Sequence, residues 1–388
     1  MVLLQLVSKV DELRELSLAF QVNASTDHGR AELLPVRSKM AQQEEHASIS
    51  RLADFKAQET YRNTHFSPGE ISPLGRDDVV LIVESKFRCE ARYEGKMVWV
   101  EWKDFMTDES HGALYQNAIR DRVPRLVLLL GSPNKPKEFR APHCVGFFED
   151  RGNNRARFGF VYEKPVGVAQ DARPISLYEL LKHKRSSLGR HIPSLSKRIA
   201  LAHRISQSLM YLHAVNWLHK SFRSNNLVFF AVTDQDVDYL EPTLCGFEYS
   251  RPDLPEELTD PLPVRPQHDS YRHPEAIGTR SKKSYDIYAL GIVLIELAHW
   301  ETIDRILEVL LDSDDTRSSQ QVLLSEKSLQ AIEGHAGEIY REVVTKCLAG
   351  GKELGVFQHE DETSAAAGEA IQLAFSERIV GPLGQLKL

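Results

Sequence analysis

The sequence predicts an α+β protein in which a small antiparallel sheet precedes a larger helical part. Short runs of β-branched and aromatic residues, separated by turn residues, fill the stretch from about 76 to 165. From about residue 175 onward, apolar positions recur at helical spacing. The change from strand-like to helical patterning therefore divides the chain into two kinds of structure.

Residues 1–75 predict a helical segment followed by a linker. Leu3, Leu6, Val10 and Leu13 alternate steps of three and four and form one apolar stripe. A second, polar helix is expected over residues 39–61. The stretch SPGEISPLG, residues 67–75, then brings two prolines and two glycines, which break a helix and mark a domain boundary.

Residues 76–165 predict the sheet. The expected strands are VVLIV (79–83), KFRCEAR (86–92), MVWVEW (97–102), CVGFFED (144–150) and FGFVYEKP (158–165). The glycine of YEGK (93–96) suits a tight hairpin turn. Helical structure is expected for residues 112–122 and again after Pro124.

Residues 166–388 predict a mainly helical part. In the stretch 195–215, Ile199, Ala202, Ile205, Leu209 and Leu212 form a helical stripe. The run SYDIYALGIVLIELAHW (284–300) is apolar nearly all round, which predicts a buried helix.

Composition excludes several classes of protein. The 388 residues are 42% hydrophobic and 27% charged, with a net charge of -7, which is typical of a soluble globular chain and argues against nucleic acid as the main partner. Four scattered cysteines without a C-x-x-C pair argue against a zinc site or a disulfide framework. No apolar run reaches the ~18 residues of a membrane span, and the start lacks the pattern of a signal peptide. We therefore expect a cytoplasmic protein without a transmembrane segment; the basic run KHKR (182–185) leaves peripheral membrane contact open.

Five motifs occur in the order found in protein kinases. The stretch LHKSFRSNN fits the frame H-R-D-x-x-x-x-N with His219, Ser221 and Asn226. The other four are WVEWK with Lys103, LCGFEYSR with Gly246, Phe247 and Glu248, YRHPEAI with Pro274 and Glu275, and SYDIYALGIVLIEL with Asp286. Over about residues 76–380 the chain thus resembles the protein kinase-like fold. The resemblance implies a β-rich N-lobe at 76–165 and a helical C-lobe at 166–388, preceded by the helical segment 1–75.

The groups that phosphoryl transfer needs are missing from this frame. Ser221 stands at the position of the catalytic carboxylate, and its hydroxyl cannot serve as a general base at neutral pH. Gly246 stands where a carboxylate would chelate magnesium. No glycine occurs between Gly75 and Gly95, so the Gly-rich loop is absent and the turn reads ESKFR (84–88). The chain therefore resembles a pseudokinase.

Other residues keep positions that matter for architecture. The resemblance implies that His219 and Phe247 pack together, that Glu275 pins the segment before the buried helix, and that Asp286 holds the backbone of the catalytic loop. No catalytic group is expected to work, and we expect neither a metal nor a cofactor, although ATP with magnesium stays an alternative.

Several roles stay open. Lys103 is either a phosphate-contacting lysine or a solvent-exposed strand end, and Glu101 stands where kinases place a small alanine against adenine. The acidic partner of Lys103 could be Asp108, Glu109 or Asp121. Asn226 is either a weak metal ligand or a hydrogen-bonding residue of the loop, and a nucleophilic pair of Ser221 with His219 is conceivable.

The phrases VEWK, DIYALGIVLIEL and EIYREVVTKCL resemble fungal kinase-like proteins that often carry a HeLo-type helical domain. That resemblance implies heterokaryon incompatibility or cell-death signalling, with residues 1–75 as a remnant of the HeLo bundle. We predict an inactive kinase-like interaction or signalling module, whose protein partner binds the N-terminal helices or the kinase-like body. The alternatives are an atypical active kinase that uses Lys103, Asn226 and a displaced carboxylate, and a nucleotide-binding switch without turnover.

Overall fold

The computed structural model describes most of the chain from residue 71 onward. The described residues are 71–83, 88–104, 112–151, 156–169, 171–182, 192–233, 236–253, 270–276, 279–311, 318–355, 362 and 364–386, together with 52, 55, 56, 58, 59, 62 and 66. They divide into two compact units. The first unit reaches to Lys164 and also includes Tyr211–Trp217 and the segment that begins at Arg251. The second unit begins at Pro165 and contains the rest of the described chain. The apolar stripe predicted at Leu3–Leu13 lies outside the described residues.

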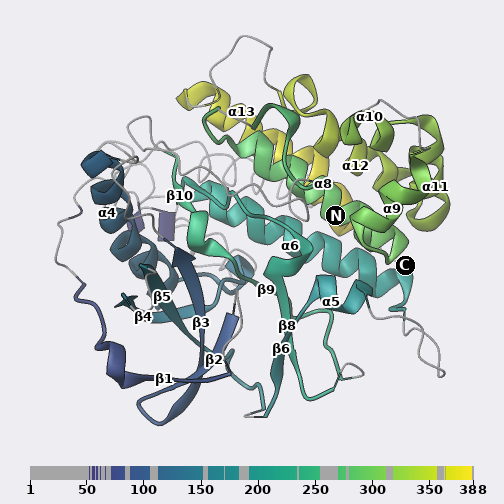
Figure 1. Ribbon diagram of the computed structural model, residues 1–388. Helices are drawn as coiled ribbons and strands as arrows, with labels where there is room; N and C mark the ends of the chain where they lie inside the picture. The colour runs from purple at the N-terminus through teal and green to yellow at the C-terminus, as the bar shows by residue number, and fades with distance from the viewer. Residues whose placement is uncertain are drawn as a thin grey trace, which may run out of the picture. The chain divides into compact units, whose positions relative to one another are not determined.

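The first unit is built on an antiparallel sheet of five strands in the order β1-β2-β3-β5-β4 (Figure 1). Its elements are η2 (Arg76–Asp78), β1 (Val79–Val83), β2 (Arg88–Tyr93), β3 (Lys96–Asp104), α4 (Gly112–Gly131), η4 (Lys137–Phe139), β4 (His143–Asp150) and β5 (Arg157–Glu163). The two-residue strands β7 (Trp217–Leu218) and β10 (Arg251–Pro252) pair with each other. The predicted antiparallel sheet is confirmed.

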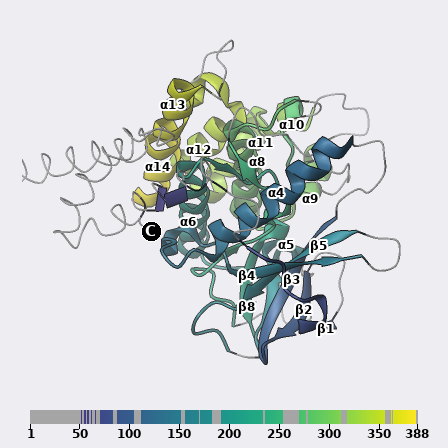
Figure 2. The same ribbon diagram turned by 90° about the vertical axis from the view of Figure 1, so that its left-hand side faces the viewer.

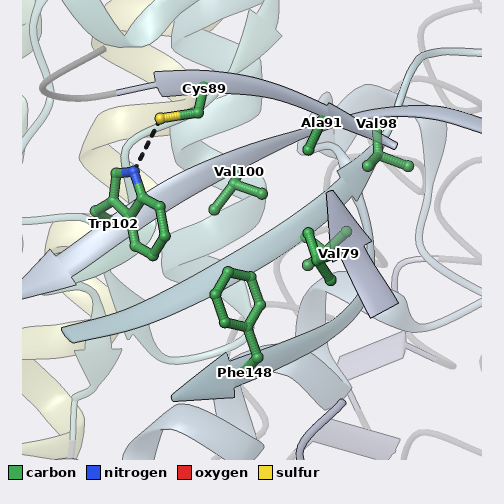
Figure 3. Close-up of a cluster of buried hydrophobic side chains, with 8 residues drawn as sticks. Val79, Cys89, Ala91, Val98, Val100, Trp102 and Phe148 are labelled. Carbon is green, nitrogen blue, oxygen red and sulfur yellow. Dashed lines mark hydrogen bonds between the residues drawn. The ribbon is translucent and has the colours of Figure 1, made fainter. Parts of the chain in front are cut away.

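The hairpin between β2 and β3 sets the register of the sheet. Glu94 and Gly95 form the two-residue turn with φ of 47° and 77°, as a primed turn requires. Because side chains alternate along a strand, Val98, Val100 and Trp102 share one face of β3. They form a buried cluster with residues of β1, β2, β4 and β5, in which the indole N–H of Trp102 donates to Cys89 Sγ at 3.0 Å (Figure 3).

Helix α4 packs against β4. It differs from the sequence-based expectation of two helical stretches, one at 112–122 and one after Pro124. Residues 112–122 and the stretch after Pro124 form one continuous helix, with Pro124 inside it. Proline lacks an N–H and normally interrupts a helix. The buried apolar residues that follow it, Leu126, Val127, Leu129 and Leu130, explain why the helix continues, because packing outweighs the loss of one hydrogen bond.

The second unit is mainly helical. Its strands are β6 (Arg173–Ser176), β8 (Leu227–Ala231) and β9 (Thr243–Leu244), in the order β6-β8-β9. Its helices are α5 (Leu177–Lys182), α6 (Leu195–Ala214), α8 (Lys283–His299), α9 (Ile303–Leu310), α10 (Ser319–Leu323), α11 (Glu326–Ala336), α12 (Glu338–Ala349), α13 (Ala365–Phe375) and α14 (Gly381–Gln385). Single turns are η5 (Ser224–Asn226), η6 (Phe247–Tyr249), η7 (Pro274–Ala276), η8 (Gly351–Leu354) and η9 (Ser376–Val380).

Helix α8 is the centre of this unit, as its apolar sequence predicts. Its residues are buried almost throughout, and it packs against α12, as Figure 2 shows. The hydroxyl of Tyr340 donates to the carbonyl of Leu294 at 2.8 Å, and Arg198 donates to the carbonyls of Leu297 and Ala298 at the end of the helix. Within the described residues, no helix is both long and apolar enough to cross a bilayer.

Candidate functional site: the catalytic-loop-like segment

Asp286 connects the first turn of α8 to the segment that resembles a catalytic loop. Its carboxylate is 3% exposed and accepts two backbone hydrogen bonds, from His219 N–H to Oδ2 and from Lys220 N–H to Oδ1, both at 2.7 Å. Lys220 has a φ of +66°, which non-glycine residues adopt at a cost. The two bonds to one rigid carboxylate hold this unfavourable backbone in place.

His219 is fully buried and serves as a packing residue in this geometry. Its Nδ1 accepts the backbone N–H of Ser221 at 3.3 Å, so Nε2 carries the proton that bonds the carbonyl of Cys245 at 3.0 Å. Its ring lies 4.9 Å from the ring of Phe247 and 5.7 Å from that of Phe222. Because Nδ1 is engaged by the backbone of Ser221 and not by its hydroxyl, the conceivable Ser221–His219 nucleophilic pair is not formed.

Ser221 receives hydrogen bonds from two side chains. Arg223 Nη1 donates to its Oγ at 2.6 Å, and the amide nitrogen of Asn226 donates to its carbonyl at 2.8 Å and to Oγ at 3.3 Å. Arg223 also lies 3.9 Å from the carboxylate of Glu248. A guanidinium group beside the hydroxyl would stabilise negative charge there, while the serine hydroxyl itself stays protonated at neutral pH and cannot take up a proton as a carboxylate would.

Asn226 fills the space that a side chain on residue 246 would need. Gly246 has a φ of +81°, and a Cβ built there would lie 2.0 Å from Asn226 Nδ2 and 2.2 Å from Asn226 Cγ. The two segments are held together by the pairing of β8 with β9 and by the bond from Cys245 N–H to the carbonyl of Asn226 at 2.8 Å. Of the two roles considered for Asn226, the structure shows the hydrogen bonds within the loop, and any side chain on residue 246 would require the Asn226 side chain to move.

The residues at these motif positions do not fit magnesium. Gly246 offers no oxygen from a side chain, and Asn226, whose Nδ2 donates to Ser221, offers only its Oδ1, which is too few ligands for a hard dication. Among the residues that the structure describes, no group of three or more His, Cys, Asp or Glu is arranged to hold a metal ion.

A buried chain of hydroxyl and carboxyl groups lies beside the loop and was missed by sequence reasoning. Ser224 Oγ lies 2.7 Å from the hydroxyl of Tyr271, which donates to Glu296 Oε1 at 2.6 Å; the same oxygen accepts Ile303 N–H at 3.0 Å. Burial raises the pKa of Glu296 to about 8 and raises the pKa of Tyr271. One acidic residue inside the apolar run ALGIVLIEL was the signal for it.

The segment before α8 is tied down by Tyr271 and not by the carboxylate of Glu275. That carboxylate is exposed on η7, and the bonds of this residue run through its backbone, with the carbonyl accepting the hydroxyls of Thr279 and Tyr285. The pinning role expected for Glu275 therefore needs correction. Phe247, by contrast, is fully buried beside His219.

Lys103 and Glu101 lie on the face of β3 opposite the cluster in Figure 3, in the first unit. Lys103 is only 3% exposed, so the alternative of a solvent-exposed strand end is wrong; β5 pairs with β3 here, placing Phe158 opposite Lys103 and Phe160 opposite Glu101. Of its expected acidic partners, Asp121 is exposed, while Asp108 and Glu109 lie outside the described residues.

Glu101 forms an ion pair with Arg88 that the sequence analysis did not foresee, and two arginine nitrogens contact one carboxylate oxygen. Arg88 Nε and Nη2 lie 2.8 Å and 2.7 Å from Glu101 Oε1, and the two residues are direct partners across β2 and β3. The side chains are 17% and 4% exposed. Of the expected ESKFR turn, only Arg88 is described, and it belongs to β2.

Two comparisons with known proteins bear on this site. The model of a family described as "Domain of unknown function (DUF7580)" matches residues 163–386. A probable serine/threonine-protein kinase of Arabidopsis thaliana, PBL20, is 26% identical over 137 residues. That match covers 33% of this chain and 33% of the kinase, so the chain spans about a third of the length of the curated relative it matches.

Proposed function

Because this chain belongs to the family described as a domain of unknown function (DUF7580), its activity must be inferred from its own residues, and we propose that it is a pseudokinase. It is a catalytically inactive, kinase-like protein that acts as an interaction or signalling module. The distant similarity to a plant kinase supports a kinase-like relationship. We further propose a two-lobed arrangement with residues 1–75 as a helical segment, 76–165 as the N-lobe and 166–388 as the C-lobe.

One observation carries the proposal. The contacts that shape the loop are complete, with Asp286 accepting both backbone bonds, while the side-chain positions that would do chemistry are occupied by groups unsuited to it. In particular, Asn226 donates to Ser221 and fills the space above Gly246. Phosphoryl transfer uses one side chain at the position of residue 246 to ligate the metal and a carboxylate at the position of residue 221, whereas this chain has a glycine and a serine there.

The Arg88–Glu101 ion pair gives independent support. A nucleotide base binds against small apolar side chains, whereas this pair presents charged groups on the corresponding face. A base bound against this face would separate the pair and leave a buried carboxylate, 4% exposed, without its counter-ion, at a cost that weak base stacking does not offset. We therefore propose that the chain does not bind ATP.

The experiment is a thermal-shift titration with ATP, with and without magnesium, followed by a phosphorylation assay with labelled ATP. We expect no shift and no transfer above a Lys103→Met control, which removes the charge from a buried position while keeping a similar length. A magnesium-dependent shift without transfer favours the nucleotide-binding switch. Transfer that is lost in the control favours the atypical kinase, with Glu248 as the displaced carboxylate, and overturns the proposal.

The biological setting follows from the narrower resemblance. We propose a role in incompatibility or cell-death signalling of the kind associated with fungal HeLo-type kinase-like proteins, with a protein partner that binds the N-terminal helices or the kinase-like body. Expression of the full chain, with and without residues 1–75, in a fungal host tests this role. An unchanged viability and growth for both versions would count against it.

A further inference from the structure

Strand β1 (Val79–Val83) forms one border of the five-stranded sheet and has no neighbouring strand on its outer side among the described residues (Figure 2). At the opposite border the chain itself lies along β4, where the Leu74 N–H donates to the carbonyl of Phe147 at 2.7 Å. On β1, the described residues supply one bond from outside the sheet, from Arg76 Nη1 to the carbonyl of Val79 at 3.0 Å. A border strand in this situation presents backbone N–H and C=O groups that can pair with another chain.

The side chains of β1 make this border both apolar and exposed. Val80, Ile82 and Val83 are 59%, 49% and 56% exposed. Of the nine large apolar side chains that are exposed in the described part of the chain, three lie in these five positions, and the other six stand singly in different segments. Border strands usually carry a lysine, a proline or another charged residue that discourages pairing, whereas β1 reads VVLIV. Such a stretch is expected to be covered by a partner.

The register of β1 limits where a partner strand can pair. Its pairing with β2 is regular from Val79 to Leu81 and shifts before Val83. A shift of this kind bends a strand and disrupts the ladder locally. We therefore expect an added strand to pair with residues 79–81 and to place a further apolar side chain against Ile82.

Carboxylates gather at the start of β1. Asp77 and Asp78 on η2 and Glu94 in the turn after β2 are exposed. Burial, Glu94 and Asp78 together raise the pKa of Tyr93, which is the partner of Val79 across the two strands. Both carboxylates therefore lie close to the first residue of β1, so this end of the strand favours a cation.

The charges also decide which kind of strand fits. The sheet is antiparallel throughout, so an antiparallel addition continues its pattern and brings the C-terminal end of the new strand to the carboxylates. A second copy of β1 is a poor occupant. With Leu81 opposite Leu81 of the second copy, the residue that follows the second strand, Glu84, would meet Asp78. A partner of different sequence, in which basic residues follow apolar ones, avoids this repulsion.

We propose that β1 is a docking edge for an extended segment of another protein, in which alternating β-branched residues are followed by lysine or arginine. The segment adds a strand to the sheet, with its backbone paired to β1 and its basic end beside Asp77 and Asp78. The inference specifies a partner for the interaction module proposed above, and it rests on that proposal only in assuming that the chain acts by binding.

Binding of a fluorescent peptide to the full chain, measured by anisotropy, tests the proposal. The probe has alternating threonine and valine residues followed by two lysines. We expect saturable binding that Val80→Lys weakens at least about tenfold, because a charge at an exposed position protects the edge. Val309→Lys, which changes a single exposed apolar residue on α9, is the matched control and should leave binding unchanged.

The carboxylates are tested by a second variant. Asp77→Asn combined with Asp78→Asn removes two charges while keeping the shape of the side chains. The variant should bind the probe about twofold to tenfold more weakly at low salt, and the difference should shrink at high salt. An unchanged affinity at low salt would contradict the assigned direction of the partner strand.

Two modified peptides test the mode of binding without any change in the chain, so they decide even where a variant does not fold. One carries methyl groups on the backbone nitrogens of its apolar stretch and cannot donate hydrogen bonds to β1. The other places the lysines first. Both should bind at least about fivefold more weakly than the probe. Hydrogen exchange should slow at residues 79–83 when the probe is added and stay unchanged in β4.

Several results would overturn the proposal. Absence of saturable binding, or equal binding of the methylated peptide, would show that no strand is added, and equal binding to the Val80→Lys chain would place the peptide elsewhere. A dimer in analytical ultracentrifugation that Val80→Lys dissociates would assign the edge to a second copy. These failures are separate from those of the pseudokinase proposal, because the responses to ATP and to the peptide are measured independently: phosphoryl transfer by a chain that still binds the peptide would remove only the pseudokinase proposal.

Discussion

The side chain of Asn226 occupies the space that a Cβ on residue 246 would need. A Cβ on Gly246 would lie 2.0 Å from Asn226 Nδ2, far inside any contact distance. Asn226 is held in that position by its bonds to the carbonyl and hydroxyl of Ser221. The small residue at 246 is therefore a condition for the present form of the loop.

The steric overlap predicts that substitutions at positions 226 and 246 have non-additive effects on the free energy of unfolding. Gly246→Ala should lower the free energy of unfolding by about 2–4 kcal/mol, because it combines steric overlap with a left-handed backbone. In an Asn226→Ala background the cost of Gly246→Ala should fall to about 1–2 kcal/mol, because only the cost of a side chain on a left-handed backbone remains. A double-mutant cycle by urea denaturation measures the difference. Equal costs in both backgrounds would show that the two residues do not compete for space.

Asp286 should matter far more to stability than the residues at the chemical positions. Asp286→Ala leaves two buried N–H groups without their acceptor, at roughly 1–3 kcal/mol each. Ser221→Ala and Asn226→Ala remove weaker or partly replaceable bonds, so their melting temperatures should change much less. Thermal denaturation of the three variants tests the order. A neutral Asp286→Ala together with an unfolded Ser221→Ala would contradict the assigned register of the motifs.

The buried carboxyl of Glu296 predicts a pH dependence. Its pKa is about 8 in the folded chain, against an ordinary value of 4.5. Between these values the folded chain holds a proton that the unfolded chain releases, so stability falls as pH rises from about 5 to 8, by at most ~1.4 kcal/mol per pH unit. Glu296→Gln keeps an acceptor for Tyr271 but cannot titrate. The free energy of unfolding of Glu296→Gln, relative to that of the unmodified chain, should therefore increase from pH 5 to pH 8. Urea denaturation at three pH values measures this difference. A difference that does not change with pH would exclude the effect.

The Arg88–Glu101 pair predicts that the two single substitutions are unequal. Arg88→Ala leaves the Glu101 carboxylate, which is 4% exposed, buried without a counter-ion. Glu101→Ala leaves the Arg88 side chain, which is 17% exposed and able to reach water. We expect Arg88→Ala to cost about 3–5 kcal/mol, Glu101→Ala clearly less, and the double substitution no more than Arg88→Ala alone. Denaturant unfolding measures all three. A double substitution that costs the sum of the singles would mean that the pair is not coupled.

Some of these features could be predicted from the sequence, and others could not. The sheet, its hairpin turn and the buried helix α8 follow from period and turn chemistry alone, since Glu94–Gly95 and the apolar run of α8 are local signals. Counting back from that two-residue turn along both strands also pairs Arg88 with Glu101, so the ion pair was predictable in principle. The burial of Lys103 was not, because it depends on β5, which pairs with β3 from a distant part of the chain.

The candidate site was predicted in position but not in detail. Motif spacing brought His219, Asn226, Gly246 and Asp286 into consideration, and the structure brings them together. The overlap of Asn226 with residue 246 depends on a backbone angle and a rotamer, which no spacing encodes. The chain of Ser224, Tyr271 and Glu296 joins three separate segments, so only the unusual acid in α8 pointed to it.

The close approach of Asn226 to Gly246 also determines which substitutions this loop accepts. With the present backbone, any side chain at 246 requires the Asn226 side chain to leave its bonds to Ser221. The two positions are therefore expected to change together: a substitution at 246 that weakens the loop by itself becomes acceptable when the residue at 226 changes as well.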